Sequence, residues 1–463
     1  MSNRTKKKTV KKKKLRKDIP EPSKNGDDSH STSTAQKKKS RFSKEQCEEN
    51  GNRKSQGGCI EYVGRALQRL KDEYQEHMYF APDEDNVIDL VLGVIAGNHF
   101  DSDPVWIHLI SPPSGGKTEL LRALHECDES YFLSDVSSKA FISGYKDDKH
   151  SRKKKSKEED SEPTEEVEED YSLLPKLDGK TVVMKDFSLI HSKPSEQRAE
   201  LFGVLRDAYD GFSSRAIGNM HTKEFHSRFN LLTGMTPDIE KYWSLNTLGE
   251  RFLMYRIQIK DRRAHALKSL DNSDSSKQFR ETLQYKVKTF IDLVPKDVVP
   301  QLPSALKERT LDLADLLSTC RSFVARYRND ETIYPPDAEL APRVAKQLMR
   351  VGQSVALVRG RRTITGSEFK LMKRVALDSL PSNRLKMLQA AWEHRAKPEQ
   401  VEVFEDTTGL SRTTARRVIE DYCELGVITR KRKVIERREK KIRVVVYQLT
   451  EEFRTHCKNV GGV

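Results

Sequence analysis

The fold of this 463-residue chain is decided by Val105-Trp106-Ile107-His108-Leu109-Ile110-Ser111-Pro112-Pro113-Ser114-Gly115-Gly116-Lys117-Thr118. The first six residues form a short apolar run, which is typical of a strand buried on both faces. A turn rich in proline and glycine follows, and Thr118 to His125 has the spacing of a helix. The stretch therefore predicts a buried parallel strand that enters a tight loop and leaves it as a helix.

The loop nearly matches the P-loop pattern Gly-x-x-x-x-Gly-Lys-Ser/Thr, with Ser111 in place of the first glycine. In that pattern backbone N–H groups surround phosphates, the lysine reaches the terminal phosphates and the hydroxyl binds Mg²⁺. We therefore expect ATP and Mg²⁺ as cofactors; an ordinary proline–glycine turn is the alternative. The expected nucleotide contacts are Ser111, Pro112, Pro113, Ser114, Gly115, Gly116, Lys117 and Thr118, with Thr118 also on the metal.

A second buried run, Thr181 to Met184, is followed by Lys185-Asp186-Phe187. A carboxylate after such a strand is expected on the Mg²⁺ side of a P-loop site, which makes Asp186 the candidate. The alternative is an aspartate that only caps the following turn. Many such enzymes have glutamate directly after this aspartate to polarise the attacking water, but here the residue is Phe187. Hydrolysis is then slow, or another acid such as Glu119 acts instead.

Strands that alternate with helices predict an α/β fold with a parallel sheet. Further buried strands are expected at Asn230–Gly234 and Phe252–Ile257, and a helix at Ser195–Tyr209. The expected division of the chain is a disordered basic tail (1–58), an ATPase core (59–275) with a low-complexity insert (146–172), a helical lid (276–379), a small α+β domain (380–453) and a tail (454–463).

The order of these motifs resembles that of the AAA+ P-loop ATPases, over about 83–380. Asn230 to Pro237 resembles the sensor-1 strand, with Thr233 or Thr236 as the polar sensor. Leu248-Gly249-Glu250-Arg251-Phe252 resembles the arginine-finger segment of minichromosome-maintenance helicases. Ala341-Pro342-Arg343 resembles the start of their lid helix. The Lys-Asp-Phe sequence is closer still to a small group of uncharacterised ATPases of phages and mobile elements.

The resemblance implies roles for two arginines. Arg251 would reach the γ-phosphate of a neighbouring subunit, and Arg343 would contact the phosphate of its own chain. A finger that acts on a neighbour implies a homo-oligomeric ring or filament. The alternatives are an arginine that flanks a strand, for Arg251, and an exposed arginine at a helix start, for Arg343.

The last region, about 380–453, resembles a winged helix-turn-helix. A helix begins after Ser411, which is a favourable N-cap, and a hairpin with a very basic tip follows at Gly426 to Leu449. In this fold one helix enters the major groove and the wing meets phosphate, although such domains also bind proteins. The candidate DNA contacts are Arg412, Arg416 and Arg417 on the helix and Lys431, Arg432 and Lys433 on the wing.

Composition limits the remaining choices. The net charge of +14 favours an anionic partner such as nucleic acid, although the basic tail alone would also produce it. The six cysteines show no zinc-binding spacing, and no apolar run is long enough to span a membrane. We expect a protein of the cytoplasm, associated with the nucleoid.

These features predict an ATP-hydrolysing, DNA-associated motor. A helicase and a helicase loader in DNA replication, with replication proteins as partners, are equally compatible with them. A DNA-binding regulatory switch with little turnover is the second reading, which Phe187 favours. The third is an interaction scaffold with a degenerate site, against which Lys117 and Thr118 argue because a dead site need not keep them.

Overall fold

The computed structural model describes residues 56–142, 172–217, 221–245, 251–327, 332, 334, 336–437 and 440–463. The expected tail up to residue 55, nearly all of the expected insert at 146–172, and Leu248 to Glu250 of the arginine-finger segment lie outside these residues. Within the described part of the chain, no helix is both long and apolar enough to cross a bilayer.

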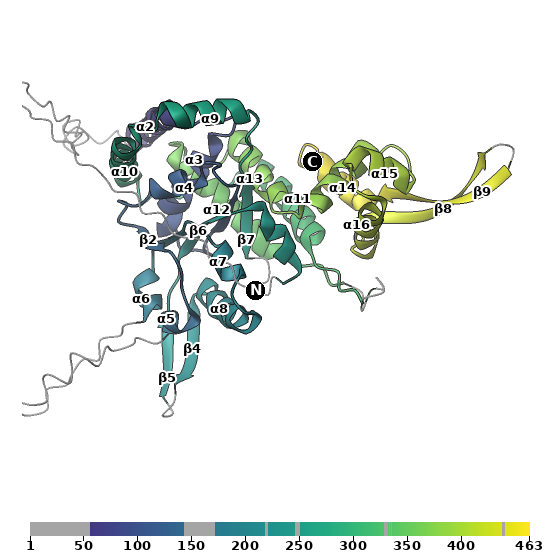
Figure 1. Ribbon diagram of the computed structural model, residues 1–463, viewed down its shortest axis with the longest axis horizontal. Helices are drawn as coiled ribbons and strands as arrows, with labels where there is room; N and C mark the ends of the chain where they lie inside the picture. Colours follow the sequence, from purple (N-terminus) through teal and green to yellow (C-terminus); the bar gives the residue numbers. More distant parts are fainter. Residues whose placement is uncertain are drawn as a thin grey trace, which may run out of the picture. The chain divides into compact units, whose positions relative to one another are not determined.

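A five-stranded parallel sheet in the order β2-β3-β6-β1-β7 forms the centre of an α/β fold (Figure 1). Its strands are β1 (Trp106–Ile110), β2 (Ser130–Leu133), β3 (Thr181–Met184), β6 (Asn230–Met235) and β7 (Phe252–Arg256). In register, Trp106 lies beside Leu231 and Phe252, and Met184 lies beside Thr233. The expected parallel sheet is therefore confirmed.

Strand β1 is buried at every position because helices cover both faces of the sheet. Its side chains alternate: Ile107 and Leu109 join one hydrophobic cluster, and Trp106 and Ile110 join the other. The helices around this sheet are α2 (Gln56–His77), α3 (Asn86–Ala96), α4 (Lys117–Arg122), α5 (Ser138–Ile142), α6 (Leu173–Leu177), α7 (Ser188–His191) and α8 (Ser195–Tyr209), with 3₁₀ turns η1 (Gly97–His99) and η2 (Pro237–Leu245).

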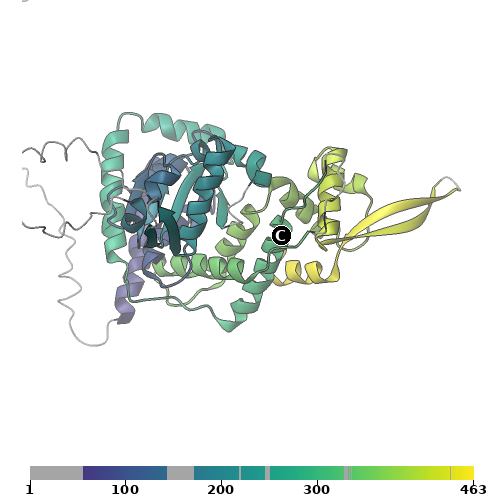
Figure 2. The same ribbon diagram turned by 90° about the horizontal axis from the view of Figure 1, so that it is seen from below.

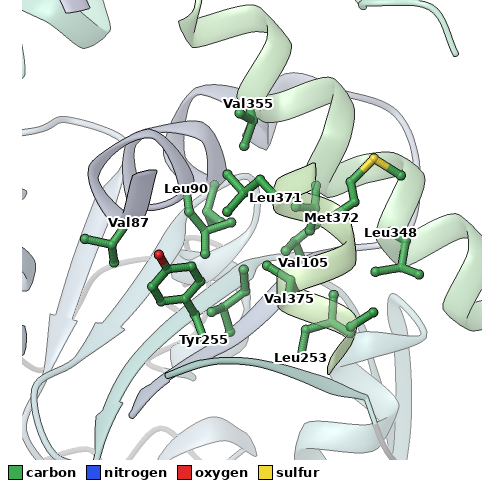
Figure 3. Close-up of a cluster of buried hydrophobic side chains, with 14 of the residues drawn as sticks. Val87, Leu90, Val105, Leu253, Tyr255, Leu348, Val355, Leu371, Met372 and Val375 are labelled. Atoms are coloured by element: carbon green, nitrogen blue, oxygen red, sulfur yellow. The ribbon is translucent and has the colours of Figure 1, made fainter. Parts of the chain in front are cut away.

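Further helices follow β7: α9 (Arg262–Asp271), α10 (Ser276–Leu293), α11 (Ser304–Arg321), α12 (Pro342–Val358) and α13 (Gly366–Asp378). Figure 3 shows how α3, α12 and α13 meet over the sheet, where Leu90, Val355 and Met372 converge on Leu253 and Tyr255. All of these side chains are fully buried. Truncating one such side chain typically costs about 2–5 kcal/mol, so this cluster is a main source of stability.

A hairpin that was not expected lies between α8 and β6. Strands β4 (Phe212–Ile217) and β5 (His221–His226) pair with each other in a separate antiparallel sheet. They are rich in polar residues and lack the apolar alternation that marks a half-buried strand, so their sequence gives little warning of them.

The last region contains α14 (Ser382–Glu393), α15 (Val401–Thr408), α16 (Arg412–Glu424), β8 (Ile428–Arg437), β9 (Lys440–Leu449) and α17 (Glu451–Asn459). Gly409 ends α15 at φ +66°, and the Ser411 hydroxyl accepts a hydrogen bond from Thr414 N at the start of α16. Strands β8 and β9 form a two-stranded ribbon that extends beyond these helices (Figure 2).

The segment 454–463 differs from the expected tail because most of it belongs to α17. The Thr450 hydroxyl caps this helix, and Phe453 and Cys457 are buried one turn apart. The helix packs on α11, where His456 Nδ1 lies 2.6 Å from Asp312 Oδ1. Helix α17 therefore ties the C-terminus to the helices that follow the sheet.

Candidate nucleotide-binding site

The loop Ser111–Gly116 lies at the carboxyl end of β1, between the strand and α4. Gly116 has φ +83°, which favours glycine, and Ser114 also has a positive φ of +63°. A Cβ at Gly115 would lie 2.5 Å from Ser111 Oγ. The Ser111 side chain occupies the space that a side chain at position 115 would need. Because residue 115 is glycine, the loop has room for a serine where the pattern has its first glycine.

The Lys117 ammonium folds back onto this loop. It donates to the Ser111 carbonyl at 3.2 Å, to Ser111 Oγ at 3.4 Å and to the Pro112 carbonyl at 3.3 Å. Burial lowers the pKa of Lys117, and the nearby charge of Asp186 opposes that shift. These acceptors are neutral, so a phosphate would be a stronger partner for the same ammonium.

A magnesium ion would find two oxygen ligands here. Thr118 is the second residue of α4, and its hydroxyl has no hydrogen-bond partner among the described residues. Asp186 follows β3, is exposed, and lies close enough to Lys117 to affect its pKa. Hydroxyl and carboxylate oxygens suit Mg²⁺, which usually keeps several waters as well.

Asp186 also has the structural role considered from the sequence. Its Oδ1 accepts a hydrogen bond from Ser188 N at 2.9 Å, at the start of α7. Phe187, by contrast, is buried and packs against His108, His191 and Phe252, with ring centroids 5.2–5.6 Å apart. Position 187 therefore faces the core, and a glutamate placed there would need to leave the core to reach the site.

Glu119, the suggested substitute acid, is held by two guanidinium groups. Arg280 of α10 contacts both of its oxygens, at 2.7 Å and 3.0 Å, and Arg122 adds a contact at 3.0 Å. These three contacts engage both oxygens and use most of the lone-pair directions of the carboxylate. The geometry does not favour Glu119 as the group that activates water.

Thr233 lies inside the sheet, whereas Thr236 lies beyond its edge. The Thr233 hydroxyl is fully buried and lies 2.5 Å from Nδ1 of His108, whose pKa burial holds far below its usual value. Met235, the last residue of β6, accepts a hydrogen bond from Ser111 N. Thr236 follows directly, so it is the threonine that the structure brings to the loop.

Arg251 and Arg343 lie at the amino ends of the strands, opposite to the end that carries the loop. Arg251 precedes Phe252, which pairs with Trp106, the first residue of β1. The length of β1 therefore separates Arg251 from the loop by about 16 Å. The Arg251 side chain is only 7% exposed and lies 2.9 Å from Asp210. Arg343 is near enough to Arg251 to lower its pKa, after the larger effect of burial. The structure therefore does not bring Arg343 to the loop of its own chain.

Sequence reasoning missed one wall of the site. A cavity of about 250 Å³ is lined by Ser114 to Glu119 and, opposite them, by residues from the end of α2 and from α9. These opposing residues are His77, Met78, Tyr79, His265, Lys268 and Ser269. On α9 the spacing of 265, 268 and 269 places them on one helical face, but nothing in the sequence connects that face to a loop 150 residues earlier.

A larger cleft, about 790 Å³, lies between α2, α13 and the segment 82–86. Its buried cations already have acidic partners: Lys71 lies 3.0 Å from Asp89, and Arg359 lies 2.6 Å from the same carboxylate. This cleft contains no part of the loop Ser111–Thr118. The smaller cavity is therefore the candidate nucleotide site.

The candidate DNA contacts divide between α16 and β8. On α16, Arg412 lies 2.8 Å from Glu402 and Arg416 lies 2.9 Å from Glu420, and both side chains are well exposed. Arg417 is exposed on the same helix. Lys431, Arg432 and Lys433 are exposed on β8, opposite Val446, Val445 and Val444 of β9. The structure thus brings all six side chains to the surface.

Comparison of the chain with models of known protein families and with curated proteins finds no match.

Proposed function

We propose that this protein is an AAA+-like ATPase that binds and hydrolyses Mg²⁺-ATP at the loop Ser111–Thr118. The observation that carries the proposal is the position of this loop at the carboxyl ends of the parallel strands. Ligands of open α/β sheets bind at that edge. Lys117 would bind the terminal phosphates, and the Thr118 hydroxyl and the Asp186 carboxylate would hold a magnesium ion, which would supply positive charge for phosphoryl transfer.

The strand order supports the proposed roles of Lys117 on the phosphates and of Asp186 on the metal ion. One strand, β6, lies between β1 and β3. The backbone at Asp186 therefore lies about 9–10 Å across the sheet from the strand that carries the loop. That spacing leaves room for a metal ion and its waters between the carboxylate and the phosphates. Thr236, at the end of the intervening strand, is the polar group best placed to orient a water molecule there.

We assign DNA binding to the region from α14 to β9, as a winged helix. Its α16 presents exposed arginines after the Ser411 cap, and its ribbon carries a basic strand. Such a helix reads a groove while the ribbon contacts phosphates. Together with the ATPase site, these surfaces favour a helicase or helicase loader in DNA replication, acting as a homo-oligomer with Arg251 at the subunit boundary.

A second candidate is a DNA-binding switch that responds to ATP with little turnover. Two observations favour it: Phe187 faces the core, and both oxygens of Glu119 are engaged by arginines. The described residues therefore offer no evident carboxylate beside Asp186 to polarise water. Slow hydrolysis is the expected consequence.

Strand displacement separates the two candidates. The full chain is incubated with a forked DNA duplex and Mg²⁺, with either ATP or a non-hydrolysable analogue. Displacement with ATP alone supports the helicase. DNA binding that changes equally with ATP and with the analogue, without displacement, supports the switch. A protein that binds neither nucleotide would contradict both.

A further inference from the structure

Helix α9 turns a polar face, with the half-buried His265 and Lys268, toward the protein and leaves its leucines outside. All ten of its residues are exposed or half-buried, and Leu267 and Leu270 are 48% and 70% exposed. Helices on a protein surface usually bury their apolar stripe. Helix α9 instead directs His265, Lys268 and Ser269 into the cavity at the loop.

Two hydrogen bonds and a ring contact link this face of α9 to the loop and to the end of α2. His265 Nε2 donates to the Ser114 carbonyl at 2.9 Å, and the His265 ring lies edge-on to Tyr79. At the other end of α9, Asn272 Nδ2 donates to the His77 carbonyl at 3.2 Å. Lys268 lies one turn from His265, on the same face, and lines the cavity with Gly116 and Lys117.

The charges around this cavity are not balanced. Glu119 is the one acid among the described residues that line it, and that carboxylate is engaged by Arg280 and Arg122 from outside the lining. Among the described residues, the Lys268 ammonium forms no ion pair with an acidic side chain. Two lysines, 117 and 268, therefore face one cavity, and no ion pair is formed there by either among the described residues, although the charge of Asp186 acts on Lys117. Such an excess of positive charge is the arrangement expected for a polyanionic ligand.

We propose that Lys268 is a second phosphate-binding cation of the nucleotide site, supplied by α9 of the same chain. Lys268 would contact the phosphate within its own chain, the role that the sequence suggested for Arg343. Arg343 itself lies at the opposite ends of the strands. This inference rests on the proposed ATPase function and adds to it a residue that contacts the phosphates. His265 is a positioning residue, because its hydrogen bond to Ser114 holds α9 over the loop.

The test uses the full chain with Mg²⁺ and two probes, ATP and inorganic tripolyphosphate, whose affinities are measured by calorimetry. Lys268→Met keeps the side-chain stem and removes the charge, and Lys268→Arg restores the charge. Arg263→Met, on the same helix but exposed and outside the cavity, is the matched control. Melting temperatures of all variants check that α9 and its surroundings remain folded.

Lys268→Met is expected to weaken ATP and tripolyphosphate by the same factor, about tenfold or more, because a charge-assisted contact is lost. Lys268→Arg should recover most of that loss, and Arg263→Met should bind as the wild type does. An unchanged affinity of Lys268→Met for both probes overturns the proposal. So does a loss for ATP alone, which would assign Lys268 to the nucleoside. If the wild type binds neither probe, the proposed ATPase function itself fails, and this inference fails with it.

Discussion

Arg280 and Glu119 form a bidentate ion pair: Nε lies 2.7 Å from Oε2, and Nη2 lies 3.0 Å from Oε1. This pair joins α10 to the start of α4, directly after Thr118. It therefore braces the helix that follows the loop. Because the pair is partly exposed, its net contribution to stability is expected to be modest, about 0.2–1 kcal/mol.

Glu119→Gln tests whether this residue braces the helix or acts as a base. We expect ATP turnover to remain within about threefold of the wild type, because both carboxylate oxygens are engaged by arginines and no proton transfer is lost. The melting temperature should fall slightly. A steady-state ATPase assay decides the matter, since loss of turnover with intact ATP binding would make Glu119 the base after all.

Asp186→Asn should separate nucleotide binding from turnover. The amide can still accept the hydrogen bond from Ser188 N, so the turn into α7 remains, but the negative charge that orients the metal is lost. We expect ATP binding to persist and Mg²⁺-dependent turnover to fall about 100-fold or more. Full turnover in this variant would leave Asp186 with only its turn-capping role.

The strands and the loop could be predicted from the sequence because their signals are local. Val105 to Ile110 and Thr181 to Met184 are largely apolar runs, and Gly115-Gly116-Lys117 follows the first of them after a turn of four residues. The choice between Thr233 and Thr236 could not be made in this way. It depends on where β6 ends beside Ser111, which the pairing of β6 with β1 determines.

The parts of the site that were missed depend on long-range packing. Arg343 is carried to the amino ends of the strands because α12 packs across α3, and no local pattern records that contact. The wall formed by His77 and α9 joins segments that are far apart in the sequence and are mostly polar. Such a wall is recognised only once the sheet has brought both segments to the loop.

Arg251 should act on the site of a neighbouring subunit. The ion pair with Asp210 must open for this, and Asp210 is exposed enough to remain solvated when it does. Arg251→Ala alone should be inactive, since such arginines contribute roughly 10³–10⁵ to the rate. Mixing it with Lys117→Ala should restore some ATPase activity at shared boundaries. Absence of recovery in particles shown to contain both variants would argue against the role in trans.

The basic strand β8 should contact DNA phosphates, whereas α16 should read bases. In a chain shortened to begin at Gln56, Lys431/Arg432/Lys433→Ala should weaken all duplexes and reduce the salt slope of log K by roughly 0.9 per lost contact. Arg416→Ala or Arg417→Ala should instead flatten sequence preference, because a bidentate base contact contributes about 1–3 kcal/mol. Lys277→Ala, at an exposed position of α10, is the control.

Fluorescence anisotropy at several salt concentrations measures both effects. An unchanged affinity and salt slope in the triple variant would remove the ribbon from the DNA-binding surface. The region from α14 to β9 would then be better explained as a protein-binding domain.

The affinity of Lys117→Ala for Mg²⁺-ATP, compared with that of the wild type by calorimetry, tests the central claim most directly. Among the described residues, the hydrogen bonds of this side chain go to the loop itself, so its removal should leave the melting temperature nearly unchanged. We predict that the wild type binds ATP and that Lys117→Ala loses detectable binding, because the loop loses its own cation for the terminal phosphates. Equal affinity of the two proteins would contradict the assignment of Ser111–Thr118 as a nucleotide-binding loop.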